Sequence, residues 1–105
     1  SMGRSEKREL ESRLELLLMH LLKWQHQPSH RGASWQASID VQRDAIAEHL
    51  GENPSLQPRL PELIAAAYRR ARIRAAAETG LGRGSFPEIG PWGFEQIAAV
   101  DFLPE

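Results

Sequence analysis

The chain has 105 residues, enough for one domain and too few for two separate hydrophobic cores. Its 13 basic and 14 acidic residues nearly cancel, so no strong overall field attracts the chain to nucleic acid or to an anionic membrane. The absence of cysteine excludes disulfides, thiolate metal sites and cysteine nucleophiles, and it agrees with a reducing cytoplasm.

A first helix is predicted from Arg4 to about Gln25, a segment with neither proline nor glycine. One face carries a row of leucines, namely Leu10, Leu14, Leu17, Leu18 and Leu21. Leu16 and Met19 lie on the other side, so the helix is either central in its domain or covered by a second subunit. We therefore take Leu16 and Met19, together with Ile73 further along the chain, as candidate oligomer contacts. The leucine-rich run is short and interrupted by charge, so no membrane partner is expected.

A second helix is predicted from Trp35 to about Leu50, after a loop broken by proline and glycine. Ser34 is the expected N-cap, and Gly51 is expected to end the helix in a left-handed conformation. One stripe of this helix combines apolar residues with a polar amide and comprises Trp35, Ile39, Gln42, Ile46 and Leu50. Arg43 and His49 border the stripe.

The amide of Gln42 needs a partner, because an unpaired buried amide costs about 1–3 kcal/mol. Two interpretations are open. In the first, Gln42 contacts a ligand in a small pocket with Trp35, Arg43 and His49. In the second, which we favour, Gln42 is an internal tie to a backbone group of the irregular C-terminal connector, since such connectors leave backbone groups that need partners.

A third helix is predicted from Pro61 to Thr79, where Gly80 stops it, because the prolines before it forbid a regular helix. A candidate basic surface for nucleic acid consists of Arg69, Arg70, Arg72, Arg74 and Arg83. These arginines are spread around the helix instead of gathering on one outward face, which favours solvated or ion-paired side chains. Glu78 follows Arg74 at the spacing of a helical ion pair.

The remaining residues, 80–105, are expected to form an arm packed on the helices, with a short helix from Trp92 to about Ala99. Phe86, Trp92 and Phe94 are expected to pin the arm, each buried ring contributing about 1.5–3 kcal/mol. An exposed aromatic patch that binds a partner is the alternative. The predicted fold is all-α: one domain over residues 1–105, a small bundle of three main helices with an irregular C-terminal arm that carries a short fourth helix.

No catalytic residue, metal site or cofactor is predicted. His26 and His30 have the spacing of a helical metal pair, but Pro28 between them breaks the helix. The glycines of GLGRG follow a helix and lack the GK[ST] of a phosphate loop, so we interpret them as a flexible turn.

The ordered motifs of the chain resemble a known family. They are KRELESRLELLLMHLLKWQ, SWxxSIxxQRxxI, PSL, AYxxAR, AxETGL, FPxxxPW, EQ and DFLP. Together they span nearly the whole chain and are similar to the family called Domain of Unknown Function 29. The resemblance implies a bacterial, mainly helical, cytoplasmic protein, and it implies no activity and no catalytic residues.

Two further expectations come from this resemblance. Many members are expected to have a cysteine where this chain has Gly90, so a thiol role at that position could not operate here. Members usually have a further N-terminal stretch, so we expect a native N-terminal helical segment to precede this chain.

Three functional hypotheses remain. The first is a non-enzymatic cytoplasmic interaction module that binds a protein partner or a second copy of itself. The second is a nucleic-acid-associated protein that uses the arginines of the third helix. The third is an enzyme with a small pocket near Trp35.

Overall fold

The computed structural model describes residues 2–105, and of Met2 only the backbone. Its α-helices are α1 (Met2–His26), α2 (Ala33–Glu52), α3 (Leu60–Thr79) and the short α4 (Phe94–Ala98). Short 3₁₀ helices occupy Pro28–His30, Pro54–Arg59 and Arg83–Ser85. No strand occurs over the described range, so the predicted all-α bundle of three main helices with a short fourth is confirmed.

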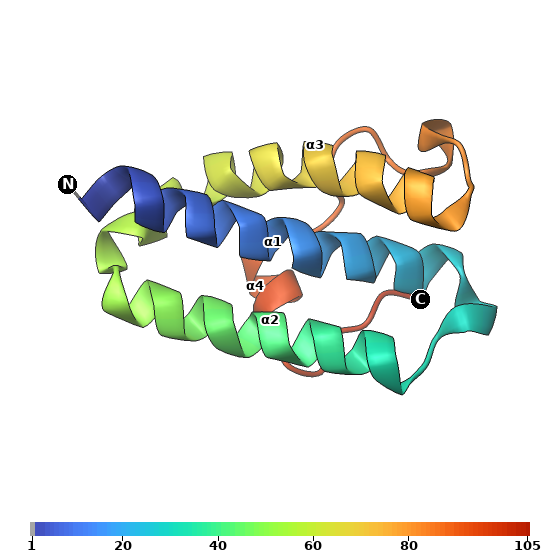
Figure 1. The fold of residues 1–105 in the computed structure, drawn as a ribbon, viewed down its shortest axis with the longest axis horizontal. Helices are drawn as coiled ribbons and strands as arrows, with labels where there is room; N and C mark the ends of the chain where they lie inside the picture. The colour runs from blue at the N-terminus through green and yellow to red at the C-terminus, as the bar shows by residue number, and fades with distance from the viewer. Residues whose placement is uncertain (1) are drawn as a thin grey trace.

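Helix α1 is the middle element of the fold and packs along both α2 and α3, which lie on opposite sides of it (Figure 1). Leu14 and Leu22 are completely buried, and Met19 is 3% exposed. A helix with a neighbour on each side needs apolar side chains around most of its circumference. The central position therefore accounts for the second apolar face of α1 without a partner subunit.

The ends of α2 differ from the prediction. Gly32, in extended backbone, precedes the first helical residue, and Ser34 lies inside the first turn. Gly51 is helical, and Asn53 closes the helix by donating from both its backbone N–H and its side-chain amide to the His49 carbonyl, at 2.9 and 3.0 Å. Asn53 thus caps the C-terminus of α2, the role that was expected of a left-handed Gly51.

The end of α3 is as predicted. Gly80 has a φ of 77°, in the left-handed region, and its N–H donates to the Ala76 carbonyl at 3.0 Å. Glycine adopts this conformation without the steric cost that a Cβ atom brings.

Ion pairs join α1 to α3 along one side of the molecule. Arg70 pairs with Glu11 at 2.5 Å and Arg74 with Glu15 at 3.0 Å. The carboxylate of Glu78 accepts from Lys23 at 2.8 Å, and this hydrogen bond lowers its pKa. The helical pair expected between Arg74 and Glu78 is wrong, because each of the two side chains reaches across to α1 instead.

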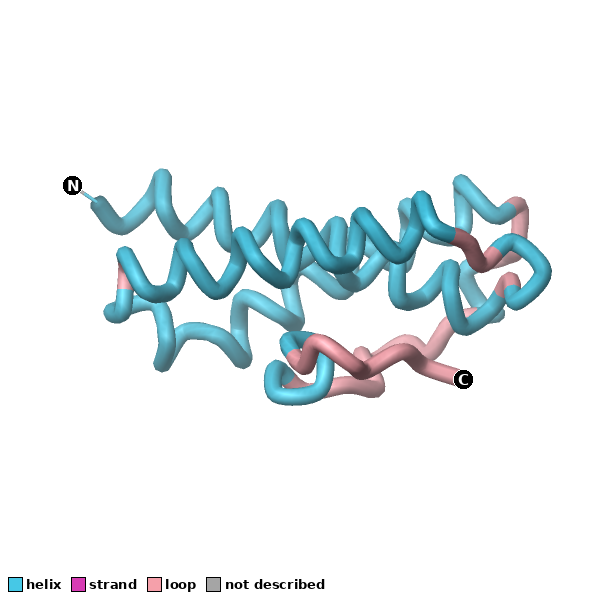
Figure 2. Tube along the Cα trace, turned by 90° about the horizontal axis from the view of Figure 1, so that it is seen from below, coloured by secondary structure: helices cyan, strands magenta, loops and turns pink. Residues whose placement is uncertain are grey.

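The C-terminal arm (residues 80–105) runs along one side of the three helices (Figure 2). Phe86 is 2% exposed and tilts against the His26 ring, with the ring centres 4.6 Å apart, while Trp92 and Phe94 are half-buried against the core. Ile97 of α4 is completely buried. The arm is therefore part of the folded domain.

Arg43 of α2 fixes the last part of the arm. Its Nε donates to the Ile97 carbonyl and one Nη to the Phe102 carbonyl, both at 2.7 Å, and the other Nη reaches the Val100 carbonyl at 3.4 Å. The arginine is 6% exposed. Burial lowers the pKa of Arg43, while the nearby Asp40 and Asp101 favour its charged form.

Candidate functional site

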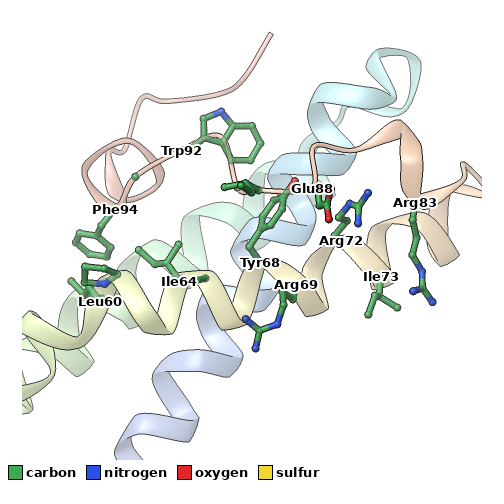
Figure 3. Close-up of a pocket in the computed structure, with 15 residues that line it drawn as sticks. Leu60, Ile64, Tyr68, Arg69, Arg72, Ile73, Arg83, Glu88, Trp92 and Phe94 are labelled. Atoms are coloured by element: carbon green, nitrogen blue, oxygen red, sulfur yellow. The ribbon is translucent and has the colours of Figure 1, made fainter.

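A groove of about 750 Å³ lies between the outer face of α3 and the arm. Figure 3 shows it with Leu60, Ile64 and Phe94 at one end and Ile73 and Arg83 at the other. Fifteen residues line it: Leu60, Pro61, Ile64, Ala65, Tyr68, Arg69, Arg72, Ile73, Arg83, Glu88, Ile89, Gly90, Trp92, Gly93 and Phe94.

Hydrogen bonds from α3 hold the arm that forms the far wall of this groove. The hydroxyl of Tyr68 donates to the Pro87 carbonyl at 2.6 Å, and Arg72 Nε donates to the Phe86 carbonyl at 3.2 Å. Gly90 lies against the Tyr68 ring so closely that a Cβ atom would stand 3.1 Å from the nearest ring carbon. The wall is thus fixed in place in the free chain.

The groove combines apolar walls with exposed apolar side chains. Ile64, Trp92 and Phe94 are half-buried, whereas Ile73 is 45% exposed and Ile89 is 83% exposed. Trp92 packs edge-on against Phe102, with the ring centres 5.9 Å apart. Exposed isoleucines and aromatic rings that pack on the core therefore line the same groove.

The charge in the groove is mainly positive. Arg69, Arg72 and Arg83 line it, and Glu88 is the one acidic lining residue. Arg72 uses its Nε on the arm, but Arg69 and Arg83 have no ion pair or side-chain hydrogen bond with any described residue.

The candidate basic surface is therefore divided. Arg70 and Arg74 are paired with glutamates of α1, while Arg69, Arg72 and Arg83 gather at the groove. The sequence interpretation of ion-paired arginines applies to the first two, and the shared position of the other three was not foreseen.

The second candidate site, near Trp35, does not come together. Trp35 and His49 are fourteen residues apart on α2, which places them about 21 Å apart along the helix axis. Trp35 lies under Lys23, whose Nζ is 4.9 Å from the indole centre, and His49 donates to the Glu6 carbonyl at 2.7 Å. Of the four candidate residues, Arg43 lines a second, smaller hollow of about 360 Å³ with Ile46 and Leu50, whereas Trp35, Gln42 and His49 line neither this hollow nor the groove.

Gln42 is an internal tie, but to a different partner from the one expected. Its side-chain oxygen accepts from Arg13 Nη1 of α1 at 3.3 Å, and the residue is half-buried. The ties to the C-terminal arm come from its neighbour Arg43. An arginine has five N–H donors in a planar fork, so it can serve several carbonyls at once where a glutamine serves one or two.

The three candidate oligomer contacts do not lie on one exposed surface. Met19 is buried within the chain and Leu16 is partly buried against the core. Ile73 alone of the three is exposed, and it lies in the groove.

Metal and membrane features are not found in the described part of the chain. No group of three or more His, Cys, Asp or Glu side chains there could hold a metal ion. His26 and His30 instead contact Phe86 and Trp35, respectively. No helix among residues 2–105 is long and apolar enough to cross a membrane.

A family model described as Domain of unknown function DUF29 matches residues 1–103, nearly the full length. The chain belongs to the DUF29 family. This membership confirms the resemblance inferred from the motifs. Three of the motif residues have structural roles here: Ile39 is buried in the core, and Arg43 and Tyr68 donate hydrogen bonds to carbonyls of the arm. No curated protein and no solved structure matches the chain.

The groove was the feature that sequence reasoning missed, although two signals pointed to it. Ile73 stands off the apolar stripe of α3, and SFPEIGPWGF is unusually apolar for an irregular segment. Only the path of the arm brings these two features to one place.

Proposed function

We propose that this DUF29 chain is a non-enzymatic helical interaction module of the cytoplasm that binds a protein partner through the groove between α3 and the arm. The observation that carries the proposal is the exposure of Ile73 and Ile89 in a preformed hollow that the half-buried Trp92 also lines. Burying apolar surface contributes about 25 cal/mol per Å², so these side chains favour association.

Rigidity of the groove supports a binding role. Hydrogen bonds from Tyr68 and Arg72 tie the arm, one wall of the groove, to α3, the other wall. A partner would therefore not need to order the arm before docking. Binding to a preorganised surface avoids the entropy cost of ordering loops, and more of the contact energy then appears as affinity.

The side chains of the groove do not form a catalytic set. Tyr68 donates its proton to a backbone carbonyl, and burial raises the pKa of its phenol, which disfavours it as a base. A nucleophile needs an adjacent general base, and none of the lining residues supplies such a pair. The enzyme alternative near Trp35 has less support, because its four residues are separately bonded.

Affinity capture with matched variants tests the proposal. Ile89→Asp places a charge in the groove, and Val100→Asp is its control, because Val100 is 81% exposed on the same arm but does not line the groove. Proteins retained by the tagged chain in its own cells are quantified by mass spectrometry. We expect a defined protein, either this chain or another, to be retained by the wild type and by Val100→Asp and to fall at least about tenfold with Ile89→Asp. Equal retention by Ile89→Asp would contradict the proposal.

The nucleic-acid alternative has narrower support. Of the five arginines, Arg69 and Arg83 have no ion pair or side-chain hydrogen bond with a described residue, and both line the groove together with isoleucines. A labelled DNA duplex titrated at low salt tests it: strong binding that weakens steeply with salt and is lost in Arg69→Glu/Arg83→Glu would replace the protein-binding proposal.

A further inference from the structure

We infer that the groove between α3 and the arm receives the outer face of α2 from a second copy of this chain, in a head-to-tail contact. This inference rests on the proposed binding role of the groove and names its occupant. It is carried by the separation of charge between two different surfaces of the molecule.

The outer face of α2 is acidic. Asp40, Asp44 and Glu48 follow one another at four-residue intervals and are all exposed. Asp44 and Glu48 make no ion pair with any described residue, and Asp40 accepts only a 3.4 Å hydrogen bond from Gln36. Helices α2 and α3 lie on opposite sides of α1 (Figure 1), so these carboxylates are on a different helix from the α3 arginines that line the groove.

The groove offers the complementary charges. Arg69 and Arg83 are free of partners in the described chain, and Arg72 has Nη groups not engaged with the arm. Opposite charges on the two surfaces would be neutralised in the contact, whereas two copies of either surface would repel one another. Such an arrangement favours a contact between unlike surfaces.

Apolar side chains and dimensions also agree. Val41 is 59% exposed beside the carboxylates, and the exposed Ala37 lets the backbone of α2 come close. The groove follows α3 from Leu60 to Ile73, about 20 Å at 1.5 Å per residue. The stretch of α2 from residue 37 to 48 rises about 17 Å. A helix face of this length fits the groove, with Val41 directed toward the exposed isoleucines.

The geometry has a consequence for assembly. Because each copy uses two different surfaces, one contact leaves a free groove on one copy and a free α2 face on the other. Such heterologous contacts add further copies until a ring closes, or they form open assemblies whose length is limited by the protein concentration. Average mass should therefore rise with concentration without stopping at a dimer.

Two charge-reversal variants test the inference by analytical ultracentrifugation. The groove variant is Arg69→Glu/Arg83→Glu, and the face variant is Asp44→Lys/Glu48→Lys. All four side chains are exposed and have no partner in the described chain, so both variants should fold, as circular dichroism checks. Arg4→Glu/Arg8→Glu is the matched control, since these arginines are exposed on α1 and line no hollow.

We expect the wild type and the control to self-associate in low salt, and each charge-reversal variant alone to be monomeric. When the two variants are mixed, the intact α2 face of the groove variant meets the intact groove of the face variant. The reversed groove and the reversed face are also opposite in charge, so the mixture should associate into complexes that contain the two variants in equal amounts. Raising the salt from low to physiological concentration should weaken this association about tenfold or more.

Three results would overturn the inference: a monomeric wild type at high concentration in low salt, unchanged association of the groove variant, or no association in the mixture of the two variants. A monomeric wild type that nevertheless captures another protein through Ile89 would leave the proposed function intact and remove only the second copy as occupant. Loss of groove-dependent capture together with a monomeric wild type would remove both.

Discussion

Replacing Arg43 by alanine is expected to release the last part of the C-terminal arm and to lower the free energy of unfolding substantially. The variant loses two hydrogen bonds of 2.7 Å, to the carbonyls of Ile97 and Phe102, and a longer one to Val100. A hydrogen bond from a charged donor contributes about 1.5–3 kcal/mol. Because the freed carbonyls regain water when the arm lifts, we expect a net loss of about 3 kcal/mol. This is a large share of a total that is about 5–15 kcal/mol for a domain of this kind.

Urea denaturation followed by circular dichroism measures this loss, and hydrogen exchange locates it. The amides of Ile97, Ala99 and Phe102 donate to arm carbonyls and should exchange faster in Arg43→Ala while the core of α1 stays protected. Arg43→Lys should lose about half as much stability, because an ammonium cannot span three carbonyls as a planar guanidinium does.

Arg8→Ala is the control, since Arg8 is exposed on α1 and should change stability by less than about 0.5 kcal/mol. If Arg43→Ala unfolds within about 1 kcal/mol of the wild type and its arm amides keep their protection, the assignment of the arm's stability to this arginine is wrong.

Four other substitutions give three separate tests. Tyr68→Phe should cost about 1 kcal/mol, because the lost hydroxyl donates to the arm. Since burial raises the pKa of Tyr68, the wild type should lose stability as pH rises from about 10 through the folded-state pKa, and denaturation midpoints of the variant should lack this decline. Glu78→Gln removes a carboxylate whose pKa is lowered by the hydrogen bond from Lys23. Because Glu78 is exposed, the pair contributes less than about 1 kcal/mol; this stability is present above about pH 4.5 and is lost as pH falls through the folded-state pKa. The variant should therefore show a flatter decline of stability in acid. Gly80→Ala should destabilise by about 1 kcal/mol in thermal unfolding because its φ is positive, whereas Gly51→Ala, inside a helix with open space around it, should stabilise by about 0.5–1 kcal/mol; equal effects would refute the assigned conformations.

Local signals predicted most of the fold. Prolines, glycines and leucine spacing predict the three long helices, their order and the end of α3 at Gly80, because these features act within a few residues. The same rules gave two wrong ends for α2. An extended Gly32 and the amide of Asn53 take the capping positions there, and the sequence does not show which of several competent residues will cap a helix.

The candidate site was less predictable, for a physical reason. Whether Arg43, Gln42 or neither serves the arm depends on where the arm passes, and this is a property of contacts more than fifty residues apart. The groove depends on the same path. Sequence spacing places Ile73 off the core stripe of α3, but it cannot place Ile89 opposite, because no period relates a helix to an irregular segment.

The middle position of α1 also governs how the chain must be made. Its leucines are translated before either neighbour exists, and the side that α3 covers stays bare until synthesis has passed Thr79. Arg43 waits longer still, until the carbonyl of Phe102 has been produced. Until α2 and then α3 have been synthesised, apolar faces of α1 are exposed in the nascent chain, and exposed apolar surface favours aggregation. A holding chaperone is therefore expected to engage the emerging helix and to let go as the arm arrives.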